Sequence, residues 1–137
     1  MKPYFFLAFY LLLIPLISLS QELKLRTINN TAFQRGEKLV FRAYYDAILT
    51  GKVTAGEVTL EITNENKKIN GRNTYHIVGV GETKGLFNLF FKVVDRYESY
   101  VDEEAIVPWV FIRRVNEGGY IINQDVMFNH AKKLAIS

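Results

Sequence analysis

The stretch that decides the fold is Arg72-Asn73-Thr74-Tyr75-His76-Ile77-Val78-Gly79-Val80-Gly81-Glu82-Thr83. Its side chains alternate with the period of two that is typical of a half-buried β-strand. One face carries Tyr75, Ile77, Gly79 and Gly81, and the other carries His76, Val78 and Val80. Because two glycines on one face leave no side chains to pack, we expect another element to cross this strand closely, or the strand to bend sharply.

The segment that follows is unusually apolar and has helical spacing. Leu86, Leu89, Phe90 and Val93 stand at positions i, i+3, i+4 and i+7, and Phe87 and Phe91 extend the apolar surface almost all the way round. A short helix that is apolar on every side needs a partner to bury it. We therefore expect Leu86–Phe91 to fill the curl of the sheet.

Strand-like alternation recurs on both sides of this centre. It covers Glu37–Asp46, Lys52–Thr63, Lys92–Asp102, Trp109–Asn116 and Tyr120–Asn129, with a hairpin loop at Asn64–Gly71. Another strand begins at Leu134, and the chain does not complete it. We predict a mainly β fold: an antiparallel meander that forms a curled sheet or half-open barrel around the short helical segment. We also expect the natural chain to continue beyond Ser137.

The N-terminus has the order of a secretory signal. Lys2 precedes an apolar run from Tyr4 to Leu19, and Ser18 and Ser20 occupy the −3 and −1 positions of a cleavage site. We predict a signal peptide at residues 1–20 that is cut after Ser20, an extended lead-in at 21–35 and one β-rich domain at 36–137. The alternative is a retained N-terminal anchor, although the run is short for a membrane span and contains Pro15.

Composition narrows the class of protein. The chain has no cysteine, which excludes a disulfide framework and a lipidated cysteine. Its 17 Lys and Arg exceed its 14 Asp and Glu by only three, and the basic pairs, such as Arg113-Arg114, are scattered. Nucleic-acid binding is not expected, because such proteins concentrate their basic residues on one element.

No catalytic grouping is apparent. His76 lies within a strand pattern and His130 begins a turn, so we expect neither to be catalytic. A zinc site that joins both histidines to a carboxylate such as Asp125 is compatible with a meander, but nothing in the sequence favours it. Asp95 and Glu98 point to opposite faces of one strand, so they cannot form the carboxylate pair of a glycoside hydrolase. We predict no catalytic residue, no metal site and no cofactor.

Six aromatic residues are candidates for binding an apolar ligand. Tyr97 and Tyr100 lie on a predicted strand whose middle is polar on both faces. Such a strand is either exposed to solvent, with a local Arg96–Glu98 ion pair, or lines a cavity with a polar mouth. We expect the other four either to belong to the core or to form an apolar wall for an acyl chain. They are Phe87, Phe90, Phe91 and Trp109.

Several motifs together resemble the domain-of-unknown-function family numbered 3108. They are Phe33–Leu39, Gly51 with Ala55-Gly56, Thr83–Tyr100, Pro108, and Arg113–Tyr120 with its Glu117-Gly118-Gly119 turn. The similarity runs from Phe33 to Phe128. It implies an exported, mainly β protein of the Gram-negative envelope whose relatives continue past the point where this chain stops. It brings no catalytic residues.

The leading hypothesis is an exported, periplasmic, non-catalytic domain that binds an apolar or amphipathic ligand such as a lipid, an acyl chain or a glycan. The alternative is a structural or assembly factor of the envelope that pairs an edge strand with a partner protein. A hydrolase of envelope polymers is the third hypothesis. After cleavage of the signal, no stable membrane span is expected.

Overall fold

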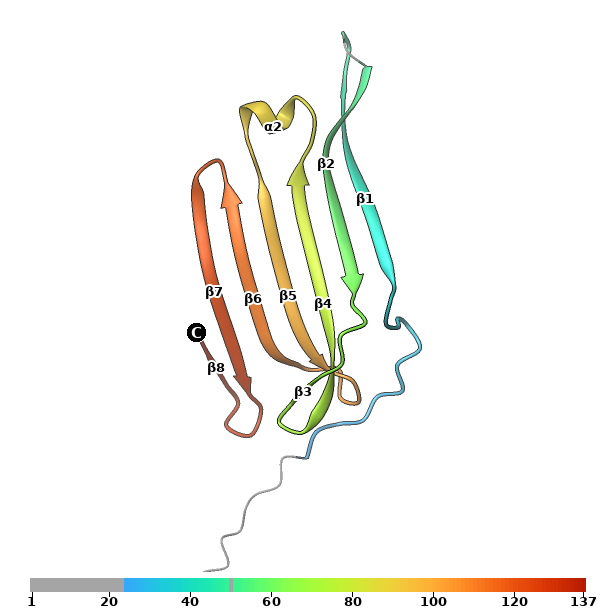
Figure 1. Ribbon diagram of the computed structural model, residues 1–137, viewed down its shortest axis with the longest axis vertical. Helices are drawn as coiled ribbons and strands as arrows, with labels where there is room; N and C mark the ends of the chain where they lie inside the picture. Colours follow the sequence, from blue (N-terminus) through green and yellow to red (C-terminus); the bar gives the residue numbers. More distant parts are fainter. Residues whose placement is uncertain (1–23, 50) are drawn as a thin grey trace, which may run out of the picture.

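The computed structural model describes residues 24–49 and 51–137. They form a single antiparallel sheet with the strand order β1-β2-β4-β5-β6-β7-β8, and the short β3 pairs with β4 beside this path (Figure 1). The predicted mainly β, antiparallel and unclosed fold is confirmed. The predicted signal peptide at 1–20 lies outside the described residues.

The strands follow the alternating segments of the sequence closely. Their bounds are β1 Lys38–Ala47, β2 Gly51–Ile62, β3 Lys67–Ile69, β4 Arg72–Thr83, β5 Val94–Asp102, β6 Pro108–Glu117, β7 Tyr120–Asn129 and β8 Leu134–Ile136. The additional strand β3 lies within the expected loop at 64–71, where Lys67 pairs with Thr74 and Ile69 with Arg72.

The helix α2 (Phe87–Phe90) does not fill the sheet, and the prediction that it would is wrong. It caps the end of the sheet between β4 and β5 (Figure 1), and it contains no buried residue. Leu89 is 78% exposed and Phe90 87%. The helix has only four residues and acts as a turn between two neighbouring strands, and its Phe87 ring meets Tyr45 of β1 edge-on at 5.7 Å.

The glycines of β4 are covered by side chains of β2. Leu60 pairs with Gly79, and its Cδ2 atom lies 3.2 Å from where a Cβ on Gly79 would stand. Val58 covers Gly81 in the same way, at 3.8 Å. The expectation that another element crosses here is therefore wrong, because side chains of the neighbouring strand β2 cover the two glycines.

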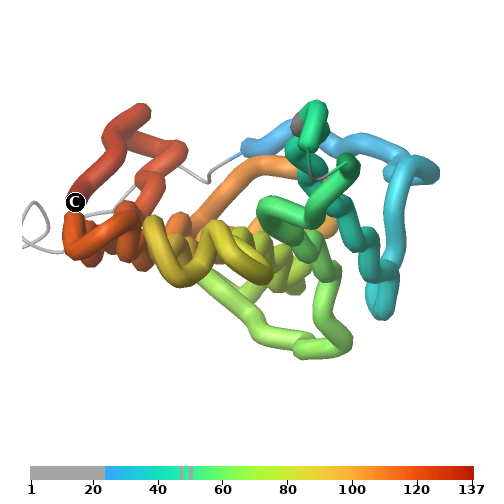
Figure 2. The backbone as a smooth tube through the Cα atoms, turned by 90° about the horizontal axis from the view of Figure 1, so that it is seen from above, coloured from blue at the N-terminus to red at the C-terminus, as the bar shows by residue number. Residues whose placement is uncertain are grey.

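The lead-in at residues 24–35 has no regular secondary structure and runs past one end of the sheet (Figure 1). The Ile28 backbone N–H donates to the Glu104 carbonyl at 2.7 Å, and the Arg26 side chain donates to the Ala105 carbonyl at 2.9 Å. Seen from above, this segment and the loop around β3 lie on opposite sides of the sheet (Figure 2). The two hydrogen bonds tie the lead-in to the corner where β5 turns into β6.

Candidate functional site

Both faces of the sheet carry apolar side chains, but most of the charged side chains gather on one of them. Strand register places a row of apolar side chains on one side, which we call the apolar face. Its members include Leu39, Phe41, Val58, Leu60, Ile77, Tyr97, Phe111, Ile122 and Val126. Several are more than 40% exposed, among them Phe41 at 53% and Leu60 at 42%. An exposed apolar surface that spans neighbouring strands is typical of a binding surface.

The opposite side, which we call the polar face, carries cross-strand ion pairs. Arg42 Nε lies 3.2 Å from Glu57 Oε2 on the neighbouring strand, and Arg114 Nη1 lies 2.6 Å from Asp125 Oδ1. The Arg114 hydrogen bond lowers the pKa of Asp125. Exposed pairs of this kind contribute less than about 1 kcal/mol each. They mark the solvent-accessible part of this face, whereas His76, Val78 and Tyr100 on the same face are buried.

A histidine cluster lies in the middle of the polar face. His76 contacts two carboxylates, with Nδ1 at 2.7 Å from Glu65 and Nε2 at 2.6 Å from Glu98, and the Tyr100 ring stacks on it at 4.4 Å. Arg96 donates to Glu98 at 2.8 Å, as the sequence predicted, and this hydrogen bond lowers the pKa of Glu98. Because each group of this cluster has a partner within it, the cluster joins β4, β5 and the loop before β3 and leaves none of these groups unpaired.

The structure disperses the six predicted ligand residues. Phe87 and Phe90 line a small apolar pocket of about 270 Å³ with Tyr45 at the α2 end. Phe91 packs over Gly118, where a Cβ would lie 2.4 Å from the ring. Trp109 lies at the opposite end of the sheet, where β6 begins (Figure 1). The expected wall of these three phenylalanines and Trp109 is therefore not formed.

The two tyrosine candidates point to opposite faces. Tyr97 pairs with Gly79 on the apolar face and stacks against Phe111 at 6.3 Å. Tyr100 is buried on the polar face against His76. Of the six candidates, only Tyr97 belongs to the apolar face. Asp95 and Glu98 likewise occupy opposite faces, as the sequence predicted.

Trp109 belongs to a buried polar corner. It has no partner in the β5–β6 register, because Val101 pairs with Pro108 and Tyr100 with Val110. This bulge turns its indole N–H toward Asp102, whose Oδ2 accepts at 3.1 Å. Burial alone would raise the pKa of Asp102, but hydrogen bonds from Arg72, Ala105 and Trp109 outweigh it and lower the pKa to about 2.

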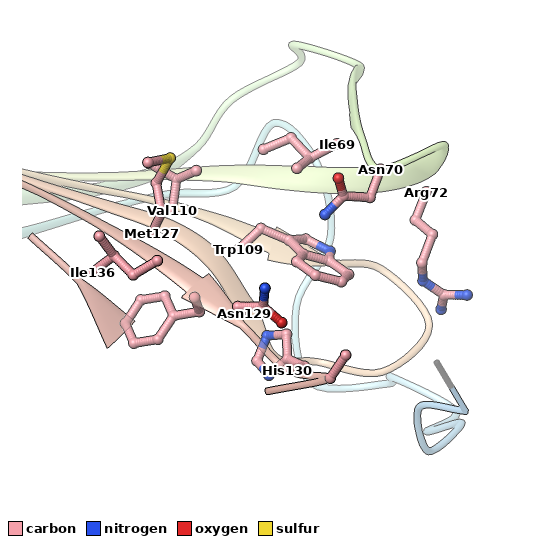
Figure 3. Close-up of a pocket in the computed structure, with 11 residues that line it drawn as sticks. Ile69, Asn70, Arg72, Trp109, Val110, Met127, Asn129, His130 and Ile136 are labelled. Atoms are coloured by element: carbon pink, nitrogen blue, oxygen red, sulfur yellow. The ribbon is translucent and has the colours of Figure 1, made fainter. Parts of the chain in front are cut away.

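A pocket of about 690 Å³ opens beside this corner. Figure 3 shows the ring of Trp109 at its centre and His130 below it, and the two rings meet edge-on at 4.8 Å. The remaining lining is mainly apolar and includes Ile69, Val110, Met127, Phe128 and Ile136. Arg72 at its edge is held by Asp102 and Glu104, and His130 Nε2 lies 2.7 Å from the Pro108 carbonyl, so both polar groups are already engaged.

Arg113 is a site residue that the sequence analysis missed. It lies on the apolar face, opposite Tyr97 on β5 and Gln124 on β7. Its Nε atom is buried without a hydrogen-bond partner. The signal is present in the alternation of β6, where Phe111, Arg113 and Val115 share a face, although composition alone shows Arg113-Arg114 only as one of several scattered basic pairs.

The part of the chain that the structure describes contains no cluster of three or more side chains arranged to hold a metal ion. Within that same part, no helix is long and apolar enough to cross a membrane.

Neither the curated proteins nor the solved structures include a significant match to this sequence. One family does match, described as a protein of unknown function (DUF3108), and the match covers residues 40–136, which is β1 to β8 almost in full. The resemblance seen in the sequence motifs is thus confirmed, and the chain belongs to the DUF3108 family.

Proposed function

We propose that this chain is a non-catalytic binding domain whose apolar face holds the acyl portion of an amphipathic envelope ligand. The observation that carries the proposal is the row of apolar side chains on one face, where Leu39, Phe41, Val58 and Leu60 are each more than 40% exposed, while the ion pairs Arg42–Glu57 and Arg114–Asp125 lie on the other face. Burial of apolar surface contributes roughly 25 cal/mol per Å², so contact with such a face would contribute favourable binding free energy even for a single acyl chain.

Export is part of the proposal. It rests on the signal-like residues 1–20. Periplasmic location would be supported by a mature protein whose N-terminal residue is Gln21 in the periplasmic fraction. A full-length protein that remains in the cytoplasm would contradict it.

The binding proposal is tested by native mass spectrometry of the purified protein and by thermal unfolding with decan-1-ol, a neutral acyl-chain probe. We expect co-purified lipid or a rise in the unfolding temperature with decan-1-ol. Phe41→Gln on the apolar face should weaken the effect, whereas Val40→Gln, at the next position on the polar face, should leave it unchanged. No bound lipid and no stabilisation would contradict the proposal.

A second candidate function is assembly by strand pairing, and one observation favours it. Strand β8 pairs with only Met127, Phe128 and Asn129 of β7, so the outer edge of β7 from Tyr120 to Val126 has no partner among the strands described. Such an edge can accept an extended segment of an envelope protein. A photo-crosslinker at Ile121 should then capture one protein of defined mass in cells, and no capture would exclude this route.

A hydrolase of envelope polymers has the least support. Glu98 is engaged by Arg96 and His76, and the Asp95 carboxylate accepts the Asn116 backbone N–H at 3.1 Å on the other face. We expect an Asp95→Asn, Glu98→Gln double variant to keep whatever activity the protein has.

A further inference from the structure

We propose that Arg113 binds the carboxylate head group of an anionic single-chain amphiphile whose acyl chain lies along the apolar face. This inference rests on the proposed function and specifies its ligand. It starts from the position of one cation in an otherwise apolar row of side chains.

The surroundings of Arg113 are suited to an amphiphile. Tyr97 lies directly across on β5, Phe111 lies two residues earlier on the same strand, and Gln124 lies across on β7. Tyr97 and Phe111 stack on one another and so present an aromatic surface beside the guanidinium. An acyl chain on this surface would place a terminal carboxylate against Arg113.

Arg113 differs from the other six arginines of the described chain in lacking a partner. Five of these form ion pairs, and Arg26 donates to the carbonyls of Ala105 and Ile106. The pairs are Arg35–Glu103, Arg42–Glu57, Arg72–Asp102, Arg96–Glu98 and Arg114–Asp125. No carboxylate of the described residues lies within 4.0 Å of the Arg113 guanidinium.

The nearest acidic residue on the apolar face does not pair with Arg113. Asp95 shares the apolar face through its pairing with Gly81, but it is buried and accepts the Asn116 backbone N–H. Burying the Nε of a guanidinium without a partner costs free energy, because its N–H has lost its hydrogen bonds to water and has formed none within the protein. The two Nη groups are not among the buried atoms, so a carboxylate on the apolar face can accept from them in the fork geometry that guanidinium favours.

The experiment compares three probes of equal chain length on the full chain: decanoate, decan-1-ol and decyltrimethylammonium, each below its micelle concentration. Isothermal titration should show decanoate binding at least about tenfold more tightly than decan-1-ol, since a hydrogen bond to a charged group is worth about 1.5–3 kcal/mol. Decyltrimethylammonium should bind more weakly than either.

Two variants locate the effect. Arg113→Met should reduce decanoate binding to the level of decan-1-ol, while Arg114→Met, on the polar face and paired with Asp125, should leave the preference unchanged. Far-UV circular dichroism verifies that each variant folds. The comparison of probes on the unaltered chain tests the inference even if a variant does not fold.

The outcomes separate the two proposals. Equal affinity for decanoate and decan-1-ol, or an anion preference that survives in Arg113→Met, overturns the role of Arg113 and leaves the proposed function standing. If none of the three probes binds, the proposed function fails as well.

Discussion

The strongest test of the fold concerns Asp102, the buried acid at the turn from β5 to β6. Its side chain is fully buried and accepts from Arg72 Nη2 at 2.9 Å, from the Ala105 backbone N–H at 2.8 Å and from Trp109 Nε1 at 3.1 Å. We predict that Asp102→Asn strongly destabilises the protein, because one carboxylate organises the whole corner.

The size of the effect follows from the pKa. Lowering the pKa of Asp102 from its ordinary 3.8 to about 2 corresponds to about 2 kcal/mol of stability, since one pKa unit is about 1.4 kcal/mol. The asparagine NH₂ would also face the N–H groups of Arg72 and Trp109, which leaves buried donors without acceptors. We expect a total loss of about 3 kcal/mol, near the lower end of the cost of breaking a buried pair.

The pH dependence has a definite sign. Because the folded-state pKa lies below the unfolded-state pKa, the contribution of Asp102 is present above about pH 4 and is lost as the pH falls toward 2. The unaltered protein should lose about 2 kcal/mol across this window from Asp102. The Asp102→Asn variant has no carboxylate to protonate at this position, so its free energy of unfolding should fall less steeply as the pH is lowered from about 4 to about 2.

The assay is urea unfolding followed by tryptophan fluorescence, since Trp109 is the one tryptophan of the chain and lies at the corner. Asp125→Asn serves as the matched control, because Asp125 also pairs with an arginine but lies exposed on the sheet surface. The control should change stability by less than about 1 kcal/mol. If Asp102→Asn behaves like Asp125→Asn at pH 7, the reasoning about the corner is refuted.

Three further predictions concern the glycines and the helix. Gly56→Ala should cost about 1–3 kcal/mol, because its Cβ would lie 3.0 Å from a backbone carbonyl of β4. Gly79→Ala should cost less than about 1 kcal/mol, because its Cβ would press mainly on the end of the half-exposed Leu60 side chain. Equal losses of stability for the two variants in thermal unfolding would contradict this reasoning. Gly118→Ala should cost at least about 1–2 kcal/mol, since φ is +57° there and the new Cβ would also displace the Phe91 ring. An unchanged unfolding temperature would contradict the turn geometry. Phe90→Ser should change the free energy of unfolding by less than about 0.5 kcal/mol, because the ring is exposed, and a larger loss measured in urea would show that the helix is packed after all.

Most of the sheet was predictable because its strands are long and alternate regularly. The bounds of β4 and β7 are those that the alternation indicates. Strand β3 escaped prediction because three residues carry no readable period, and its pairing depends on the Asn70-Gly71 turn that brings it back to β4.

The site was harder to predict, because its arrangement depends on register. An apolar segment such as Leu86–Phe91 is expected to be buried, but hydropathy does not reveal that a four-residue helix lies at the end of a sheet. The bulge that turns Trp109 toward Asp102 depends on the pairing of β5 with β6. Arg113 emerged only once that register placed it among Tyr97, Phe111 and Gln124.

The central claim is that one face of the sheet is the binding surface, and methyl-labelled NMR of the full chain with decanoate tests it most directly. The account predicts shifts of the Val58 and Leu60 methyl groups on the apolar face, with Val40 and Ile112 on the polar face unchanged. Shifts confined to Met127 and Ile136 in the pocket beside Trp109, or spread equally over both faces, would contradict it.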